Sequence, residues 1–305
     1  MDSLLIIIVT FNGKSHIKQC LKDIKNIPNS EIIIIDNHSD DDTVQIIKNI
    51  FPNITLITNE KNIGFGQANN IGFRYALEKG FHFVLLLNQD TYIDKKAITS
   101  LLNVMDSNKE YGILSPLHFY SENKLQKSFS YHIKSNTKLV KDLENNILNQ
   151  EIYDVPFVNA AIWLLSKECI EKVGGFCPEF FHYGEDDNYC HRVQFRGYKI
   201  GVVPTIKGFH LSLDKHPKYF ENKEAELWIL QQKINILNPN IHYNLRKEML
   251  ILSMRIFKSI LFLRKKTRIQ LIQRFKSLLT LDLKELKKIK YSFIHNELTF
   301  IKNRM

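Results

Sequence analysis

The sequence predicts an α/β fold in which helices flank a mostly parallel central sheet, followed by a basic helical extension. Three observations carry this prediction. Short apolar runs alternate with segments of helical period over about the first 90 residues. Apolar residues make up 44% of 305, enough for a sizeable core. Of the 42 Lys and Arg residues, 16 lie in residues 241–305 against only 4 acids there, so the positive charge is concentrated at the end of the chain.

The first part of the chain alternates predicted strands with predicted helices. In order, these are strand Leu4–Val9, helix Lys14–Asn26, strand Glu31–Asp36, helix Asp41–Asn49, strand Ile54–Thr58, helix Gln67–Lys79 and strand Phe83–Leu87. Strands separated by helices imply right-handed crossovers and a parallel sheet. In such a sheet, ligands bind beyond the carboxyl ends of the strands.

Polar side chains stand where the predicted strands end. They are Thr10 and Asn12 after the first strand, Asp36 to His38 after the second, Asn62 after the third, and Asn88 and Asp90 after the fourth. A single residue of this kind, such as Asp36, would be explained by a turn or a helix cap. Because four separate segments converge on one edge, we expect a nucleotide-binding cleft there.

The segment NIGFGQANNIG, Asn62–Gly72, contains the pair Gly64 and Gly66. A dinucleotide-binding fingerprint would need a third glycine at position 69, which is Asn, and it would follow the first strand. A tight turn at the start of a helix is a second explanation. We favour a loop whose small residues let the chain approach a bound nucleotide.

The motifs VTFN, IIIIDNHSDD, NIGFGQANNIG and NQD, taken in this order, resemble the family 2 glycosyltransferases of the GT-A fold. The similarity is to bacterial rhamnosyltransferase-like members and covers roughly residues 4–212. The family binds a nucleoside-diphosphate sugar with a divalent metal, Mg²⁺ or Mn²⁺. The resemblance implies that Thr10, Asn12 and Asp36 contact the base and ribose, and that Asn62, Gly66 and Asn69 line the same pocket.

The resemblance also places Asn88, Gln89 and Asp90 where the family carries its D-x-D metal motif. Asp90 is then the metal ligand and the anchor of the diphosphate. Asn88 departs from the pattern, because an amide oxygen brings no negative charge. One carboxylate can suffice for Mg²⁺ or Mn²⁺ when phosphate and water complete the shell.

Three acids in a row, Glu185, Asp186 and Asp187, precede a helical stretch. The helix dipole would favour acids there. Transfer of a sugar to a hydroxyl, however, needs a general base, and clustered acids raise one another's pKa values. The resemblance assigns base catalysis to Glu185 and Asp186, of which we favour Asp186, while Asn188 departs from the family's last acid.

In the family, the strand that corresponds to Phe157–Ser166 lies beside the acceptor site. In this chain it contains Asn159 and Trp163. A plain core strand is an equal explanation for Trp163. Family members often carry a histidine at the place of His210, where it completes the metal site; a structural role is the alternative. A neutral imidazole suits Mn²⁺ better than Mg²⁺.

We expect a GT-A catalytic domain over residues 1–215, with a nucleotide-sugar half of about 1–92 and an acceptor half of about 93–215. Residues 216–305 form a helical basic region. Within it, Met249–Phe275 has the pattern of a basic amphipathic helix, which predicts peripheral membrane contact through 241–290. A helical hairpin packed on the catalytic domain is the alternative. No nucleic-acid-binding module is recognisable, so we expect no nucleic-acid partner.

We expect the protein to be a metal-dependent, inverting glycosyltransferase (a hexosyltransferase of family 2). It would move rhamnose or a hexose from a dTDP- or UDP-sugar to a hydroxyl of a cell-surface polysaccharide or lipid-linked glycan. The N-terminus lacks the pattern of a signal peptide, so we expect a cytoplasmic protein, peripheral at the inner face of the cell membrane. An inactive nucleotide-binding scaffold and a nucleotidyltransferase are the alternatives, and a homodimer is left open.

Overall fold

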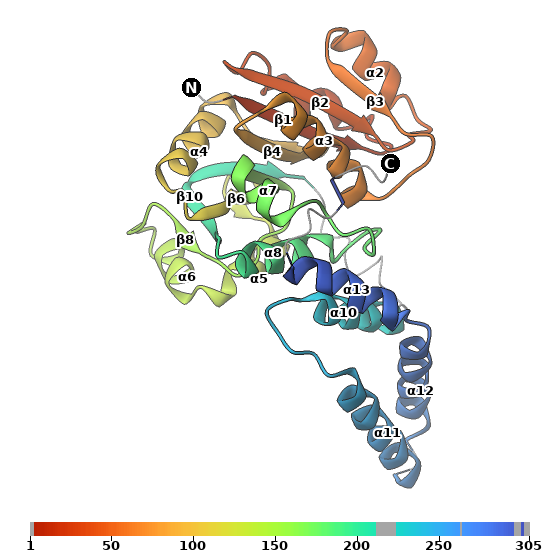
Figure 1. Ribbon diagram of the computed structural model, residues 1–305. Helices are drawn as coiled ribbons and strands as arrows, with labels where there is room; N and C mark the ends of the chain where they lie inside the picture. Colours follow the sequence, from red (N-terminus) through yellow and green to blue (C-terminus); the bar gives the residue numbers. More distant parts are fainter. Residues whose placement is uncertain (1–2, 212–223, 263, 296–299, 302–305) are drawn as a thin grey trace. The chain divides into compact units, whose positions relative to one another are not determined.

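The computed structural model describes residues 3–211, 224–262, 264–295 and 300–301. Contacts between Cα atoms divide the chain into two compact units. The first comprises Met1–Asp214 with Glu297–Met305, and the second comprises Lys215–Asn296. In Figure 1 the second unit is the group of helices coloured from teal to dark blue.

A mixed ten-stranded sheet forms the centre of the first unit, with the strand order β3-β2-β1-β4-β9-β6-β10-β5 and with β7 and β8 attached to β6 and β10. The strands are β1 Leu4–Thr10, β2 Ser30–Asp36, β3 Thr55–Thr58, β4 Phe83–Asn88, β5 Thr91–Tyr92, β6 Tyr111–Ser121, β7 Lys124–Leu125, β8 Tyr153–Asp154, β9 Ile162–Ser166 and β10 Lys199–His210. Figure 1 shows β1, β2 and β4 running side by side.

The four strands β3, β2, β1 and β4 are mutually parallel, as the alternation of elements predicts. Their register sets Thr10 beside Asp36 and Val9 beside Asn88. The strand ends that the sequence singles out therefore lie next to one another.

Both faces of this parallel half are covered, which explains why β1 is apolar throughout. Leu5 and Ile7 pack with α3, Phe65–Lys79, on one face. Their neighbours along the strand pack with α1, Ile17–Lys22, and α2, Thr43–Ile50, on the other. Alternate residues of a strand point to opposite faces, so a strand covered on both sides needs an unbroken apolar run.

Helix α1 is shorter than the predicted Lys14–Asn26. The chain before it makes a turn in which the Gly13 carbonyl accepts from the backbone N–H groups of His16 and Ile17. Asn26 has a positive φ of 58°, which is incompatible with a continuing helix.

The other half of the sheet is mixed. Strand β9 runs antiparallel to both β4 and β6, β10 runs parallel to β6, and β5 runs antiparallel to β10. The helices of this half are α4 Lys95–Ser107, α5 Lys127–His132, α6 Thr137–Glu144, α7 Lys167–Val173 and α8 Glu185–Phe195, with a 3-10 turn at Ile133–Ser135. Strand β5 follows β4 almost directly but pairs with the end of β10, which sets Thr91 opposite His210.

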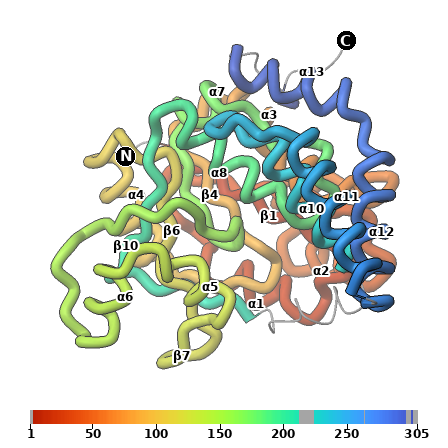
Figure 2. The backbone as a smooth tube through the Cα atoms, turned by 90° about the horizontal axis from the view of Figure 1, so that it is seen from below, coloured from red at the N-terminus to blue at the C-terminus, as the bar shows by residue number. Residues whose placement is uncertain are grey.

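The second unit is helical. It contains α10 Glu224–Leu237, α11 Leu245–Leu261, α12 Lys265–Leu279 and α13 Leu283–Ile294. The prediction of a single amphipathic helix over Met249–Phe275 is wrong, because α11 ends at Leu261 and a second helix, α12, begins at Lys265. Helices α11 and α12 lie side by side (Figure 2) and enclose a small core of Leu252, Leu271 and Leu278. None of the helices in the described part is long and apolar enough to cross a membrane.

Candidate active site

The ends of β1 and β2 hold one carboxylate rigidly. The Thr10 hydroxyl donates to Asp36 Oδ1 at 2.9 Å, and Ser39 donates to the same carboxylate from its backbone N–H at 2.9 Å and its hydroxyl at 2.6 Å. Asn12, in the left-handed region at φ 50°, donates its backbone N–H to the Ser39 hydroxyl at 2.9 Å. Thr10, Asn12 and Asp36 are thus one cluster, as the sequence predicts for residues that share a ligand.

A second amide network fixes the loop that follows β3. The side chain of Asn37 donates to Asn62 Oδ1 at 2.8 Å, and its own oxygen accepts from Ile63 N–H at 2.9 Å. Asn62 Oδ1 also accepts from Gly64 N–H at 2.9 Å. Asn37 was predicted only as one of the polar residues at the strand ends, without a role of its own; in the structure it holds the loop after β3.

The glycine turn is packed against protein. Gly64 has φ 85°, and a Cβ there would lie 2.4 Å from the Phe181 carbonyl oxygen. A Cβ on Gly66 would lie 2.8 Å from Phe176 Cβ. Asn69 is buried and donates to a backbone carbonyl one turn earlier in α3. Gly66, which was predicted to line the nucleotide pocket, lets the segment before α8 approach α3, whereas the hydrogen bond of Asn69 stays within α3.

The side chain of the middle residue of NQD, Gln89, contacts the residue directly after β1. Gln89 Oε1 accepts from the backbone N–H of Phe11 at 3.0 Å, and Gln89 Nε2 donates to the Phe11 carbonyl at 3.0 Å. A Cβ on Gly13 would lie 2.1 Å from Gln89 Oε1, so a larger residue there would displace the Gln89 amide. Gln89, predicted as a nucleotide-sugar contact, therefore orients the loop that carries Asn12.

Asp90 and His210 meet because β5 pairs with β10. His210 Nε2 lies 3.5 Å from Asp90 Oδ1. Burial raises the pKa of Asp90, but the hydrogen bond and charge of His210 outweigh it, and the pKa lies below its ordinary value. The other ring nitrogen of His210, Nδ1, faces the buried side-chain amide of Gln126. It lies 2.9 Å from Gln126 Nε2 and 3.1 Å from Gln126 Oε1.

The residues at this end of the sheet suit a hard divalent cation. Asn88 Oδ1 is buried and has no hydrogen-bond partner among the described residues. It lies two residues from the Asp90 carboxylate, which is itself beside His210. Over the described ranges, no three His, Cys, Asp or Glu side chains gather as a metal site. The protein can offer one carboxylate, one imidazole and one amide oxygen, a set that fits Mg²⁺ or Mn²⁺ only if phosphate and water supply the remaining ligands.

Helix α8 presents the three predicted acids in its first turn, directly after Gly184 at φ 87°. Burial and the charge of Asp187 raise the pKa of Asp186 to about 7. Burial and the charge of Asp186 raise the pKa of Glu185 well above its ordinary value. Glu185 is buried and its Oε2 has no partner within the described part of the chain, whereas Asp186 is half-buried. Of the pair, Asp186 is the better exposed.

The departure at Asn188 has a structural explanation. Asn188 is buried, and its Oδ1 accepts from Arg192 Nε at 3.0 Å. Arg192, also buried, donates to the carbonyls of Val173 at 2.8 Å and Gly175 at 2.7 Å. The Arg192–Asn188 pair ties α8 to the turn that precedes the acids. Arg192 is not among the predicted site residues, because no local pattern marks a buried arginine.

A short segment before β9 connects the NQD end to the acids. The Asn88 backbone N–H donates to the Ala161 carbonyl at 3.0 Å. The backbone of the preceding residue, Ala160, hydrogen-bonds Asp186 and lowers its pKa against the larger effect of burial. Asn159, predicted near the acceptor, is half-buried in this segment. Trp163 is fully buried, 5.9 Å from the Tyr189 ring, which favours its core role over contact with an acceptor.

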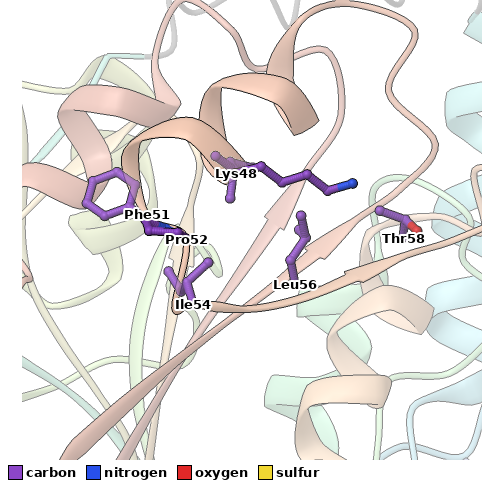
Figure 3. Close-up of a pocket in the computed structure, with 7 residues that line it drawn as sticks. Lys48, Phe51, Pro52, Ile54, Leu56 and Thr58 are labelled. Carbon is purple, nitrogen blue, oxygen red and sulfur yellow. The ribbon is translucent and has the colours of Figure 1, made fainter.

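A hollow of about 310 Å³ lies elsewhere, between α2 and the edge strand β3 (Figure 3). It is lined by Ile47, Lys48, Phe51, Pro52, Ile54, Leu56 and Thr58. In Figure 3 the Lys48 side chain extends from α2 over Leu56. None of the predicted site residues lines it.

The sequence is similar to those of known proteins. Residues 5–174 match the family described as glycosyl transferase family 2. The dTDP-rhamnosyl transferase RfbF of Shigella flexneri is 27% identical over 226 residues, 71% of this chain and 72% of that protein. The rhamnosyltransferase WbbL of Escherichia coli K12 is 23% identical over 250 residues, 76% and 91% of the two chains. The low-salt glycan biosynthesis hexosyltransferase Agl10 of Haloferax volcanii is 25% identical over 217 residues, 69% and 67%.

Solved structures share the fold. The mannosyltransferase PcManGT of Pyrobaculum calidifontis, in complex with GDP-Man and Mn²⁺, superposes with a TM-score of 0.55 at 14% identity, over 96% of this chain and 74% of that one. TarS 1-349 of S. aureus, in complex with UDP, superposes with a TM-score of 0.54 at 15% identity, over 97% and 92%. The fold is the GT-A type that the sequence predicts. The chain belongs to glycosyl transferase family 2 and is a glycosyltransferase of the hexosyltransferase class.

Proposed function

We propose that this protein is a metal-dependent, inverting transferase that moves rhamnose or another hexose from a dTDP- or UDP-sugar to a hydroxyl of a cell-surface polysaccharide or lipid-linked glycan. Relatives named as rhamnosyl and hexosyl transferases support the choice of sugar. Structural neighbours in complex with UDP or GDP-Man support a nucleotide-sugar donor.

The nucleoside would bind where β1 and β2 end. Asp36 is held by Thr10 and Ser39, so its carboxylate is already oriented to accept hydrogen bonds from a base or ribose. Phe11, next to Asn12, leaves 45% of its surface exposed although both of its backbone groups are fixed by Gln89. An exposed aromatic ring on a fixed backbone offers a face for a nucleobase.

Asp90, His210 and the amide oxygen of Asn88 would hold the divalent metal, Mg²⁺ or Mn²⁺. The bound ion would neutralise the charge that develops on the departing diphosphate. Asp90 suits this role because its lowered pKa keeps it ionised throughout the physiological range. Gln126 orients His210: when Nδ1 carries the proton and donates to the Gln126 oxygen, Nε2 is unprotonated and could bind the ion in place of its contact with Asp90.

Asp186 would act as the general base. It takes the proton of the acceptor hydroxyl, whose oxygen attacks the anomeric carbon. The bond from that carbon to the diphosphate oxygen breaks, and its electron pair leaves with the nucleoside diphosphate. Attack opposite to the leaving group inverts the anomeric configuration. A pKa of about 7 suits this task, because a base works best when its pKa lies near the working pH.

One observation carries the proposal: the Ala160–Ala161 segment hydrogen-bonds both Asn88 and Asp186, which supports assigning the proposed metal end and the proposed base to one site. The test is turnover of a panel of dTDP-, UDP- and GDP-sugars with Mn²⁺, Mg²⁺ or EDTA, with and without a glycan acceptor pool. We expect metal-dependent turnover of at least one donor. If no donor turns over and no nucleotide binds in a metal-dependent way, the protein is the inactive scaffold.

We also propose that the second unit makes the membrane contact predicted for 241–290, and that the enzyme works at the inner face of the cell membrane. The basic excess of residues 241–305 supports this, because that leaflet is anionic. Homodimerisation remains a separate prediction, tested by the mass of the protein in solution.

A further inference from the structure

Helix α11 leaves a continuous apolar stripe uncovered on its outer face. Leu250, Met254, Phe257 and Leu261 follow one another at helical spacing, and each is at least half exposed. Phe262, at the end of the helix, is 68% exposed. The opposite face buries Leu252 and Ser259. A helix of a soluble protein ordinarily packs its apolar stripe against the core. Helix α11 instead has a second apolar face that no other part of the described structure covers.

The stripe is flanked by cations. Between Leu245 and Ile269 the chain carries eight Lys and Arg residues and a single acid, Glu248. At 100° per residue, Lys247 and Lys258 border the stripe on one side and Arg246 borders it on the other, and all three are exposed. Glu248 is half-buried and lies toward the packed face.

The cations beside the apolar stripe favour one kind of binding partner over another. A second copy docking stripe to stripe would bring these cations against their equivalents, with no acid on the stripe's borders to offset the repulsion. An apolar face bordered by Lys and Arg is the pattern of a helix that lies in the plane of an anionic bilayer.

We propose that the outer face of α11 binds the surface of an anionic phospholipid bilayer. The stripe from Leu250 to Leu261 and Phe262 would enter the boundary between headgroups and acyl chains. Arg246, Lys247 and Lys258 would contact lipid phosphates. This inference rests on the membrane contact proposed above and deepens it, because it names the surface, the lipid class and the orientation of the helix.

Sedimentation with vesicles tests it, using full-length protein and phosphatidylcholine vesicles with or without 30 to 40% phosphatidylglycerol (about the anionic fraction that gives a strong surface potential). Leu261 and Leu279 form a matched pair, with 62% and 63% of their surfaces exposed near the ends of α11 and α12. We expect Leu261→Gln to weaken binding to anionic vesicles about tenfold, and Leu279→Gln to leave it unchanged. Lys247→Gln with Lys258→Gln should weaken binding about tenfold or more and reduce its salt dependence.

Three results would overturn the inference: no preference for anionic vesicles, equal effects of Leu261→Gln and Leu279→Gln, or a wild-type dimer that Leu261→Gln converts to monomer. The last result would assign the stripe to a second copy. Donor turnover with a soluble acceptor, measured on the same preparations, separates this test from that of the proposed function. A protein that turns over donor but ignores vesicles refutes only the membrane surface.

Discussion

Gln89 and Phe11 are joined by a two-point amide contact: the side chain of Gln89 accepts from the backbone N–H of Phe11 and donates to its carbonyl, both at 3.0 Å. The contact spans from the end of β4 to the end of β1, two adjacent parallel strands. It fixes the loop that carries Asn12 relative to the residue pair Asn88 and Asp90. Gln89 is therefore a positioning residue between the two halves of the proposed donor site.

Gln89→Glu should disturb donor binding without unfolding the protein. The carboxylate keeps an acceptor for Phe11 N–H but replaces the donor with a charge that faces the Phe11 carbonyl. We expect the KM for the donor to rise about tenfold with little change in kcat. The exposed Gln45→Glu on α2 is the control. Equal kinetics for Gln89→Glu and wild type would show that the contact does not shape the site.

Asp90→Asn should remove metal-dependent nucleotide binding. The substitution keeps the shape of the side chain but loses the only carboxylate among Asn88, Asp90 and His210. We expect the affinity for UDP or dTDP in the presence of Mn²⁺ to fall by at least about 100-fold, and the affinity measured in EDTA to stay the same. Calorimetry with both conditions measures this, with the exposed Asp106→Asn as control. An unchanged Mn²⁺-dependent affinity would remove Asp90 from the metal site.

Gln126→Leu should weaken Mn²⁺ binding about 10- to 100-fold, because residues that orient a metal-binding histidine contribute on this scale. Gln126→Glu keeps an acceptor for His210 Nδ1–H and should restore most of the affinity. Free Mn²⁺ counted by electron paramagnetic resonance, in the presence of UDP, reports binding without reference to turnover. If the Leu and Glu variants bind Mn²⁺ equally, Gln126 does not act through His210.

Asp186→Asn should lower kcat by about 100- to 10,000-fold, the usual contribution of a general base. In the wild type, activity should fall below about pH 7, because protonated Asp186 cannot take the acceptor proton. The neighbouring charge of Asp187 raises the pKa of Asp186, so Asp187→Asn should move this acidic limb to lower pH while preserving most of kcat. If the acidic limb of the pH–activity profile lies at the same pH in Asp187→Asn as in the wild type, Asp186 is not the group that titrates.

Stability provides an independent check on the same residue. The pKa of Asp186 rises from 3.8 to about 7 on folding, so the folded protein holds a proton that the unfolded chain has released between these values. Stability should therefore fall as pH rises through this window and stay lower above it. Asp186→Asn removes this penalty, and we expect its Tm at pH 8 to exceed that of the wild type by a few degrees. A lower Tm would mean that the loss of activity reflects damage to the fold.

Much of the parallel half of the fold follows from local pattern. An unbroken apolar run such as that of β1 indicates a strand covered on both faces, and the polar residues that follow it mark where that apolar run stops. The grouping of Thr10, Asn12 and Asp36 follows from the parallel register, which joins residues at equivalent strand ends. These features follow from patterns within single strands, so they can be predicted from the amino-acid sequence.

Other parts of the site arise from contacts between distant segments, which no local pattern encodes. His210 reaches Asp90 because β5 pairs with β10 across 118 residues of chain, and Gln126 reaches His210 from the start of α5. The same long-range packing turns Gln89 toward β1 and buries Glu185 and Trp163. A residue's type limits the chemistry it can perform, but the direction of its side chain and its exposure to water depend on which neighbours fill the surrounding space.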